Sequence, residues 1–89
     1  MTDRIEIEFR PSEGAILRLI GLVERRGFEV RGVDMPETEA DAPMRMGLQI
    51  KARDEGRKMP ILCAQLAKVY GVRAVYAGGA QHAPYEVAS

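Results

Sequence analysis

The chain of 89 residues contains no asparagine and no tryptophan, and it has only one cysteine and one histidine. A lone cysteine, Cys63, can form no disulfide within the chain and gives no zinc-binding pattern. No metal or cofactor is therefore expected, and a reducing, cytoplasmic location is predicted. Basic excess is also absent, because thirteen basic residues balance thirteen acidic ones. Nucleic acid, which is normally bound by a basic surface, is not expected as a partner.

Long hydrophobic runs are missing as well. No stretch approaches the length of a membrane-spanning helix, so no membrane partner is expected. The opening residues MTDRIEIEF contain no apolar run of the kind that marks a signal peptide. The composition, with 46% hydrophobic and 29% charged residues, is typical of one globular domain with a small core. A chain this short often gains stability by oligomerising.

The first half of the chain changes from strand to helix periodicity around Pro11. Apolar and polar residues alternate over residues 4–9, which predicts a half-buried strand that Pro11 ends. We expect Ser12 to cap the next helix, with Glu13 in its first turn. The helix should continue to about Arg26 and end at a left-handed glycine. Its predicted apolar face comprises Ile16, Leu17, Leu19, Ile20, Leu22 and Val23.

A second strand completes the first half, and the second half repeats the order strand, helix, strand. Gly32 interrupts the alternation of the second strand and suggests a bulge. Pro60 is tolerated in the first turn of the second helix, which we expect to carry Val69 and Tyr70 on its apolar face and to end at Gly71. The predicted elements are a strand over 28–35, a loop over 36–43, a strand over 44–53, a helix from about 59 to 70 and a strand over 72–77.

This order, βαββαβ, predicts an α+β fold of the ferredoxin-like type. Its four-stranded antiparallel sheet carries both helices on one face. The domain should span residues 1–77 and be followed by a flexible tail over 78–89. Because the first and third strands are neighbours in this topology, their outward charges should be complementary. Those charges are Glu6 and Glu8 on one strand and Arg45 and Lys51 on the other.

Several functions known for this fold lack the residues they require. An RNA-recognition module would need aromatic side chains on its central strands, where this chain has charges and glycine. A soft-metal carrier would need paired cysteines in the first loop. An acylphosphatase-type enzyme would need an asparagine. His82 lies in the predicted tail and Cys63 on an apolar helix face, so we identify no catalytic residue.

The ordered motifs resemble the ACT domain and, more narrowly, the short small (regulatory) subunit of acetolactate synthase. The resemblance covers about residues 4–77 and includes PILCAQLAKVYGVRAV in the second half. The matching positions of the first half are Gly14, Ile16, Arg18, Leu19, Val23, Arg26, Gly27 and Phe28.

The resemblance implies a non-catalytic subunit that binds and activates the large, thiamine-diphosphate-dependent subunit in branched-chain amino-acid biosynthesis. It also implies a homodimer in which the two sheets pair side by side into one continuous sheet, with an amino-acid effector at the seam. The first loop of one chain and the second strand of the other would form that site. The candidate residues are Pro11, Ser12, Glu13, Gly14, Ala15, Glu29 and Val30.

Two departures from the family pattern bear on the effector. Asparagine stands at the positions of Pro11 and Glu29 in valine-sensitive relatives. Each lost hydrogen bond to a charged ligand group weakens binding by about 1.5–3 kcal/mol, so we expect weak or absent valine binding. A stand-alone amino-acid-binding ACT protein and an unrelated enzyme on the same fold remain the alternatives. Arg25, Arg31 and the loop over 36–43 are candidate contacts for the large subunit.

Overall fold

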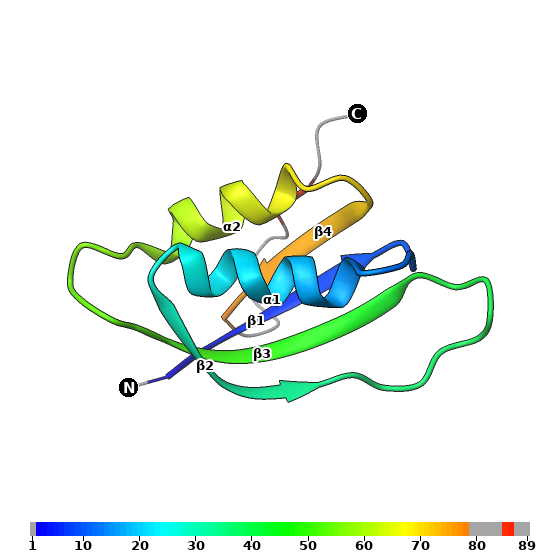
Figure 1. Cartoon of the computed structure of the whole chain (residues 1–89), viewed down its shortest axis with the longest axis horizontal. Helices are drawn as coiled ribbons and strands as arrows, with labels where there is room; N and C mark the ends of the chain where they lie inside the picture. Colours follow the sequence, from blue (N-terminus) through cyan, green and yellow to red (C-terminus); the bar gives the residue numbers. More distant parts are fainter. Residues whose placement is uncertain (1, 79–84, 87–89) are drawn as a thin grey trace.

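The computed structural model describes residues 2–78 and 85–86, which form one antiparallel sheet covered by two helices on one face (Figure 1). The elements are β1 (Asp3–Phe9), α1 (Ala15–Arg25), β2 (Phe28–Asp34), β3 (Met44–Ala52), α2 (Met59–Ala67), β4 (Val72–Ala77) and β5 (Tyr85–Glu86). The strand order is β2-β3-β1-β4-β5. The predicted ferredoxin-like arrangement is confirmed, and β5 adds a short strand beside β4. The rest of the predicted tail, with His82, lies outside the described residues.

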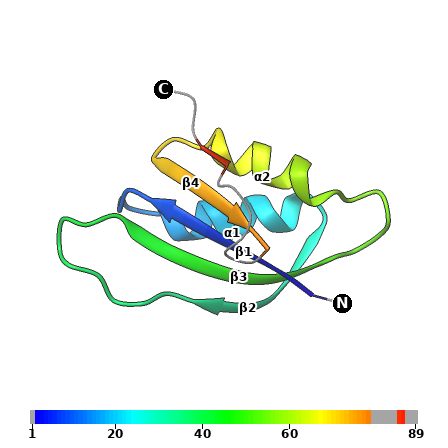
Figure 2. The same cartoon turned by 180° about the vertical axis from the view of Figure 1, so that it is seen from behind.

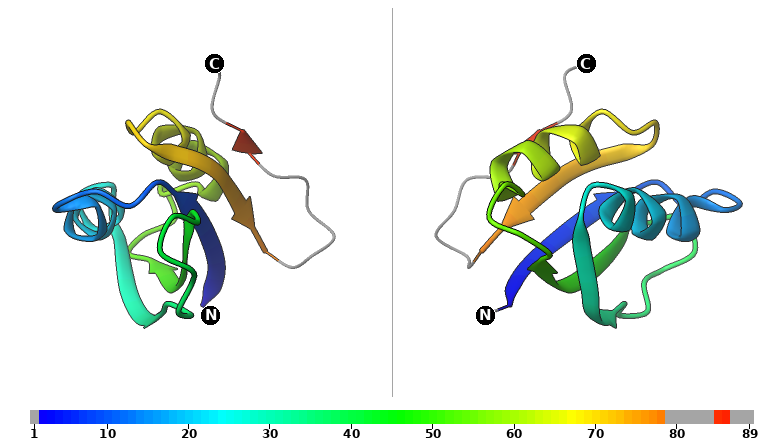
Figure 3. Two further views of the ribbon diagram at one scale, coloured as in Figure 1. Left: turned by 90° about the vertical axis from the view of Figure 1, so that its right-hand side faces the viewer. Right: turned by 60° about the vertical axis from the view of Figure 1, so that its left-hand side comes forward.

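The core forms where the inward faces of the strands meet the helices. Ile5, Ile7 and Phe9 of β1 are buried, and so are Met46, Leu48 and Ile50 of the neighbouring strand β3. Their alternation follows from the strand geometry, which sends successive side chains to opposite faces of the sheet. Figure 3 shows both helices on the same side of the sheet.

No helix covers the opposite face of the sheet (Figure 2), and charged side chains of β1 and β3 form ion pairs on it. Arg45 contacts both Glu6 and Glu8, at 3.5 and 3.3 Å between nitrogen and carboxylate oxygen. The predicted complementarity between β1 and β3 is therefore confirmed for Arg45. It is wrong for Lys51, because the register places that residue opposite Glu29 of β2 instead.

The helices are shorter than their sequence pattern predicts. Leu17, which we expected on the apolar face of α1, is 77% exposed. The second helix ends at Ala67, so Tyr70 lies beyond it and is 91% exposed. In both cases the packing direction depends on where the helix sits over the sheet, which periodicity alone does not determine.

The predicted turn residues are found where expected. Gly27 follows α1 with φ of 91°, in the left-handed region that favours glycine. The register of β2 against β3 shifts between Val30 and Gly32, which confirms the bulge. Pro60 lies in the first turn of α2. Within residues 2–78 and 85–86, no helix is long and apolar enough to cross a membrane.

Candidate functional site

The loop between β1 and α1 begins the candidate site. Gly14, with φ of 78°, is the residue that caps α1, and no side chain caps the helix. The prediction for Ser12 is therefore wrong: its carbonyl oxygen accepts a hydrogen bond from the amide of Ala15 at 3.2 Å, which forms a turn ahead of the helix. Glu13 likewise precedes the first helical turn.

Arg18 folds back from α1 over this loop. Its Nη1 donates to the carbonyl oxygen of Glu13 at 3.1 Å, and its Nη2 donates to Oγ of Ser12 at 3.3 Å. The site prediction omitted Arg18, although its position one turn after Gly14 places it on the same helix face. The guanidinium group thus brings a positive charge directly to the loop.

The start of α1 also keeps backbone donors. The first helical bond runs from the amide of Arg18 to the carbonyl oxygen of Gly14. Among the described residues, the amides of Ile16 and Leu17 have no backbone acceptor. Pro11 has no N–H group to add to them. The loop therefore offers helix-start donors beside an arginine, a combination suited to an anionic group.

The remaining predicted site residues lie elsewhere in the same chain. Glu29 and Val30 begin β2, which follows the far end of α1. Because α1 has 11 residues, about 16 Å of helix separates them from the first loop. Arg31 holds the carboxylate of Glu29 at 3.0 Å. One chain thus brings together only the loop residues of the predicted set.

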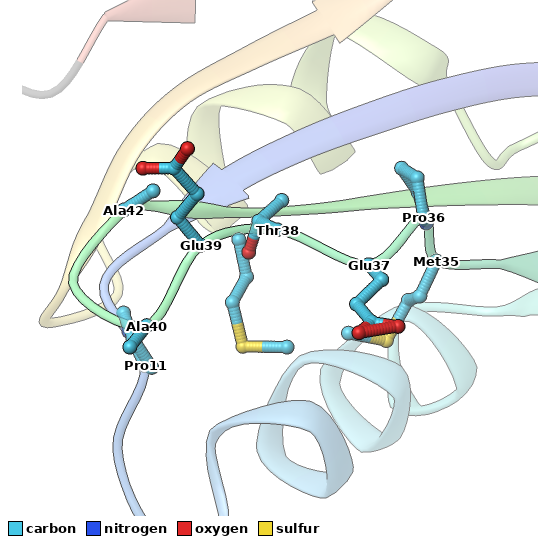
Figure 4. A pocket seen from close by; sticks show the side chains of 9 residues that line it. Pro11, Met35, Pro36, Glu37, Thr38, Glu39, Ala40 and Ala42 are labelled. Atoms are coloured by element: carbon cyan, nitrogen blue, oxygen red, sulfur yellow. The ribbon is translucent and has the colours of Figure 1, made fainter.

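The structure instead brings Pro11 against the loop between β2 and β3. Together they form an open hollow of about 300 Å³ (Figure 4). Its floor contains the half-buried side chains of Met35 and Met44, and its other lining residues belong to the segment 36–42. Sequence reasoning did not place this hollow, since the approach of the two loops depends on the sheet register.

Titratable groups suited to catalysis are not assembled in the described part of the chain. Residues 2–78 and 85–86 contain no group of three histidine, cysteine, aspartate or glutamate side chains that could hold a metal. Cys63 is fully buried, as predicted for a core residue, and burial raises the pKa of its thiol to about 11. A thiol held in this protonated form is a poor nucleophile at neutral pH.

Comparison with known proteins places this geometry in a family. The crystal structure of the ACT domain from GTP pyrophosphokinase of Chlorobium tepidum superposes with a TM-score of 0.69 at 19% identity, covering 86% of this chain and 96% of that one. The solution structure of the same domain gives 0.69 at 20% identity, covering 97% and 96%. These likenesses show the shared fold. No curated protein sequence matches the chain. The sequence model of the ACT domain matches residues 11–75, and the chain therefore belongs to the ACT domain family.

Proposed function

We propose that this chain is a non-catalytic regulatory subunit that activates the large, thiamine-diphosphate-dependent subunit of acetolactate synthase. Membership of the ACT family supports the regulatory role, because these domains are regulatory and bind amino acids. The choice of partner is supported by the ordered motifs that resemble the small subunit of that enzyme. Two solved structures that superpose on it come instead from a GTP pyrophosphokinase.

We further propose that the effector site binds valine weakly or not at all. This proposal is supported by the hydrogen bonds within the loop between β1 and α1. Arg18 already donates to Ser12 and Glu13 there, and Pro11 has no amide hydrogen. A ligand carboxylate would have to compete with Ser12 and Glu13 for the guanidinium group of Arg18.

Pairing of two chains through β2 would complete the site. β2 lies at one edge of the described sheet, so its outer backbone groups are available to another strand. Val33 on this strand is 50% exposed, and Leu17 on the neighbouring helix is 77% exposed. Side-by-side pairing would cover both and could bring Glu29 and Val30 of one chain toward the first loop of its partner. ACT domains commonly dimerise, which supports this part of the proposal.

The alternative, a stand-alone amino-acid-binding ACT protein, is favoured by one observation. The free amides of Ile16 and Leu17 retain the geometry that holds a carboxylate at a helix start. Such a protein would bind an amino acid tightly without needing a catalytic partner.

The deciding experiment mixes the purified chain with the acetolactate synthase large subunit. We expect a complex on gel filtration and a rise in acetolactate formation over the large subunit alone. Absence of both would contradict the activator proposal. Calorimetric titration with valine is expected to show no binding at micromolar concentration, whereas tight binding would support the alternative.

The same titration of the Pro11→Asn/Glu29→Asn variant isolates the effector chemistry. Restoring two hydrogen-bonding side chains should raise valine affinity by about a hundredfold, since each 1.4 kcal/mol corresponds to a factor of ten. Asp3→Asn, which changes an exposed carboxylate at the start of β1, provides the control and should leave valine affinity unchanged.

A further inference from the structure

The hollow between Pro11 and the segment 36–42 is bounded by two different kinds of side chain. Met35 and Met44 line it from the ends of β2 and β3, and both pack against the hydrophobic core. Methionine is flexible and polarizable, so a surface that exposes it adapts to apolar side chains of different shapes. The inner part of the hollow is therefore suited to an apolar group.

The outer part of the hollow is acidic. Glu37 and Glu39 both line it and are exposed, and Figure 4 shows their side chains extending to opposite sides of the loop. Ion pairs among the described residues include neither of them, although the carboxylates of the open sheet face are paired with arginine. No basic residue lines the hollow. The charge at its rim is thus left without a partner within the described chain.

Basic side chains line a second, smaller hollow that shares Pro11 with the first. Arg10 and Arg73 line it together with Asp41, and its volume is about 80 Å³. Asp41 therefore has basic neighbours on its side of the loop, and it is left out of the inference. The uncompensated charge is confined to Glu37 and Glu39.

We propose that this hollow is a docking site for a protein segment that presents an apolar side chain next to a lysine or arginine. The apolar side chain would rest on the two methionines, and the basic group would pair with Glu37 or Glu39, according to the side of the loop on which it lies. The volume of about 300 Å³ lies at the lower limit of small-molecule pockets, which span roughly 300–1,000 Å³ and enclose their ligands. An open hollow of this size fits one inserted side chain better than an enclosed metabolite.

The inference rests on the proposed function only for the identity of the partner, which would be the catalytic subunit. Charge complementarity of this kind gives specificity and faster association. The segment 36–42 projects at the end of the domain where β1 stops (Figure 1), so a partner could reach it without disturbing the sheet.

The first test uses peptide probes and requires no catalytic subunit. The full chain with ¹³C-labelled methionine methyl groups is titrated with N-acetyl-Leu-Arg-amide and, separately, with N-acetyl-Leu-Glu-amide, to about 10 mM. The arginine peptide should shift the signals of Met35 and Met44 and leave Met59, a half-buried methionine at the start of α2, unchanged. The glutamate peptide should bind at least about fivefold more weakly.

The variant Glu37→Gln/Glu39→Gln should remove the difference between the two peptides while leaving the fold intact. Equal shifts from both peptides with the unmodified chain would overturn the proposal. So would shifts at Met59 as large as those at Met35, or no shift at all with the arginine peptide.

The second test measures affinity for the large subunit. Reversing both rim charges in Glu37→Lys/Glu39→Lys should weaken the complex by about tenfold or more. The control, Asp3→Lys/Glu55→Lys, reverses two exposed carboxylates elsewhere on the surface and should leave affinity unchanged. Equal losses in both variants would contradict the assignment of the hollow. If the unmodified chain does not bind the large subunit, the proposed function fails, and the peptide titration alone decides whether the hollow is a docking site.

Discussion

Arg4 on β1 reaches across β3 to form a two-pronged ion pair with Asp34 on β2. Its Nη1 lies 2.8 Å from Oδ1 of Asp34, and its Nη2 lies 3.1 Å from Oδ2. Gly47 of β3 lies opposite Asp34 in the sheet, directly beneath the guanidinium group. A β-carbon at this position would collide with the Arg4 side chain and lie 2.8 Å from Oδ1 of Asp34. The glycine therefore leaves the space through which the pair forms.

The Arg4–Asp34 pair predicts a specific acid dependence of stability. The hydrogen bonds from Arg4 lower the pKa of Asp34 below its ordinary value of 3.8. A lowered folded-state pKa stabilises the fold above pH 3.8, and this contribution is lost as the pH falls through the lower, folded-state value. Asp34→Asn should be slightly less stable than the unmodified chain at pH 7, and the difference should close in strong acid. Urea unfolding at several pH values measures it.

Two further variants separate this pair from general charge effects. Gly47→Ala should displace Arg4 and show the same loss of acid dependence as Asp34→Asn, with no further loss when the two are combined. Asp3→Asn removes an exposed carboxylate from β1, the strand that carries Arg4, and should retain the pH dependence of stability of the unmodified chain. Additive effects of Gly47→Ala and Asp34→Asn would contradict the geometry.

Substitution of Gly14 should destabilise the domain. Its φ of 78° is strained for a residue with a side chain, and a β-carbon would lie 3.0 Å from Nη1 of Arg18. We expect Gly14→Ala to lower the free energy of unfolding by about 1–2 kcal/mol, measured by urea denaturation.

Ser12→Ala is the matched variant in the same loop. A serine that caps a helix contributes about 0.5–2 kcal/mol, but the hydroxyl of Ser12 caps no helix here and accepts a hydrogen bond from Arg18 instead. Its loss should change stability by less than about 0.5 kcal/mol. A loss as large as that of Gly14→Ala would restore the capping interpretation.

The outer face of α1 should control self-association. Leu17 is 77% exposed. Gly21 lies one turn further along α1, and a β-carbon added to Gly21 would approach only Nη1 of Arg25, at 3.6 Å. Leu17→Lys should shift the chain toward monomer in sedimentation equilibrium, because it replaces an apolar contact with a charge. Ile61→Lys, a 59% exposed position on α2, is the control. A dimer equally stable in both variants would place the seam elsewhere.

The buried thiol of Cys63 should react slowly in the native chain. Burial raises its pKa from 9.0 to about 11, and two units lower the thiolate fraction at pH 8 by about a hundredfold. Reaction with an aromatic disulfide reagent should therefore be at least about a hundredfold slower than in the urea-unfolded chain. Equal rates before and after unfolding would show that the helix face opens readily.

Residue periodicity determined both helices and the first four strands of this protein, and the buried face of β1 and β3. Alternation along β1 and β3 identified the core face, because side-chain direction in a strand depends only on position along it. Gly27 and Pro60 marked the end of one helix and the start of the other, because their backbone restrictions are local. Family membership was predicted from the same ordered residues.

Only the tertiary structure decided which distant groups meet. Arg18 lies over the first loop, Arg4 pairs with Asp34 above Gly47, and Pro11 joins the segment 36–42 to form a hollow. Each contact depends on strand register and on how a helix lies over the sheet, and a shift of one residue would change every partner. The sequence supplies the residues that make these contacts. The packing of the sheet and helices decides how close they lie to one another.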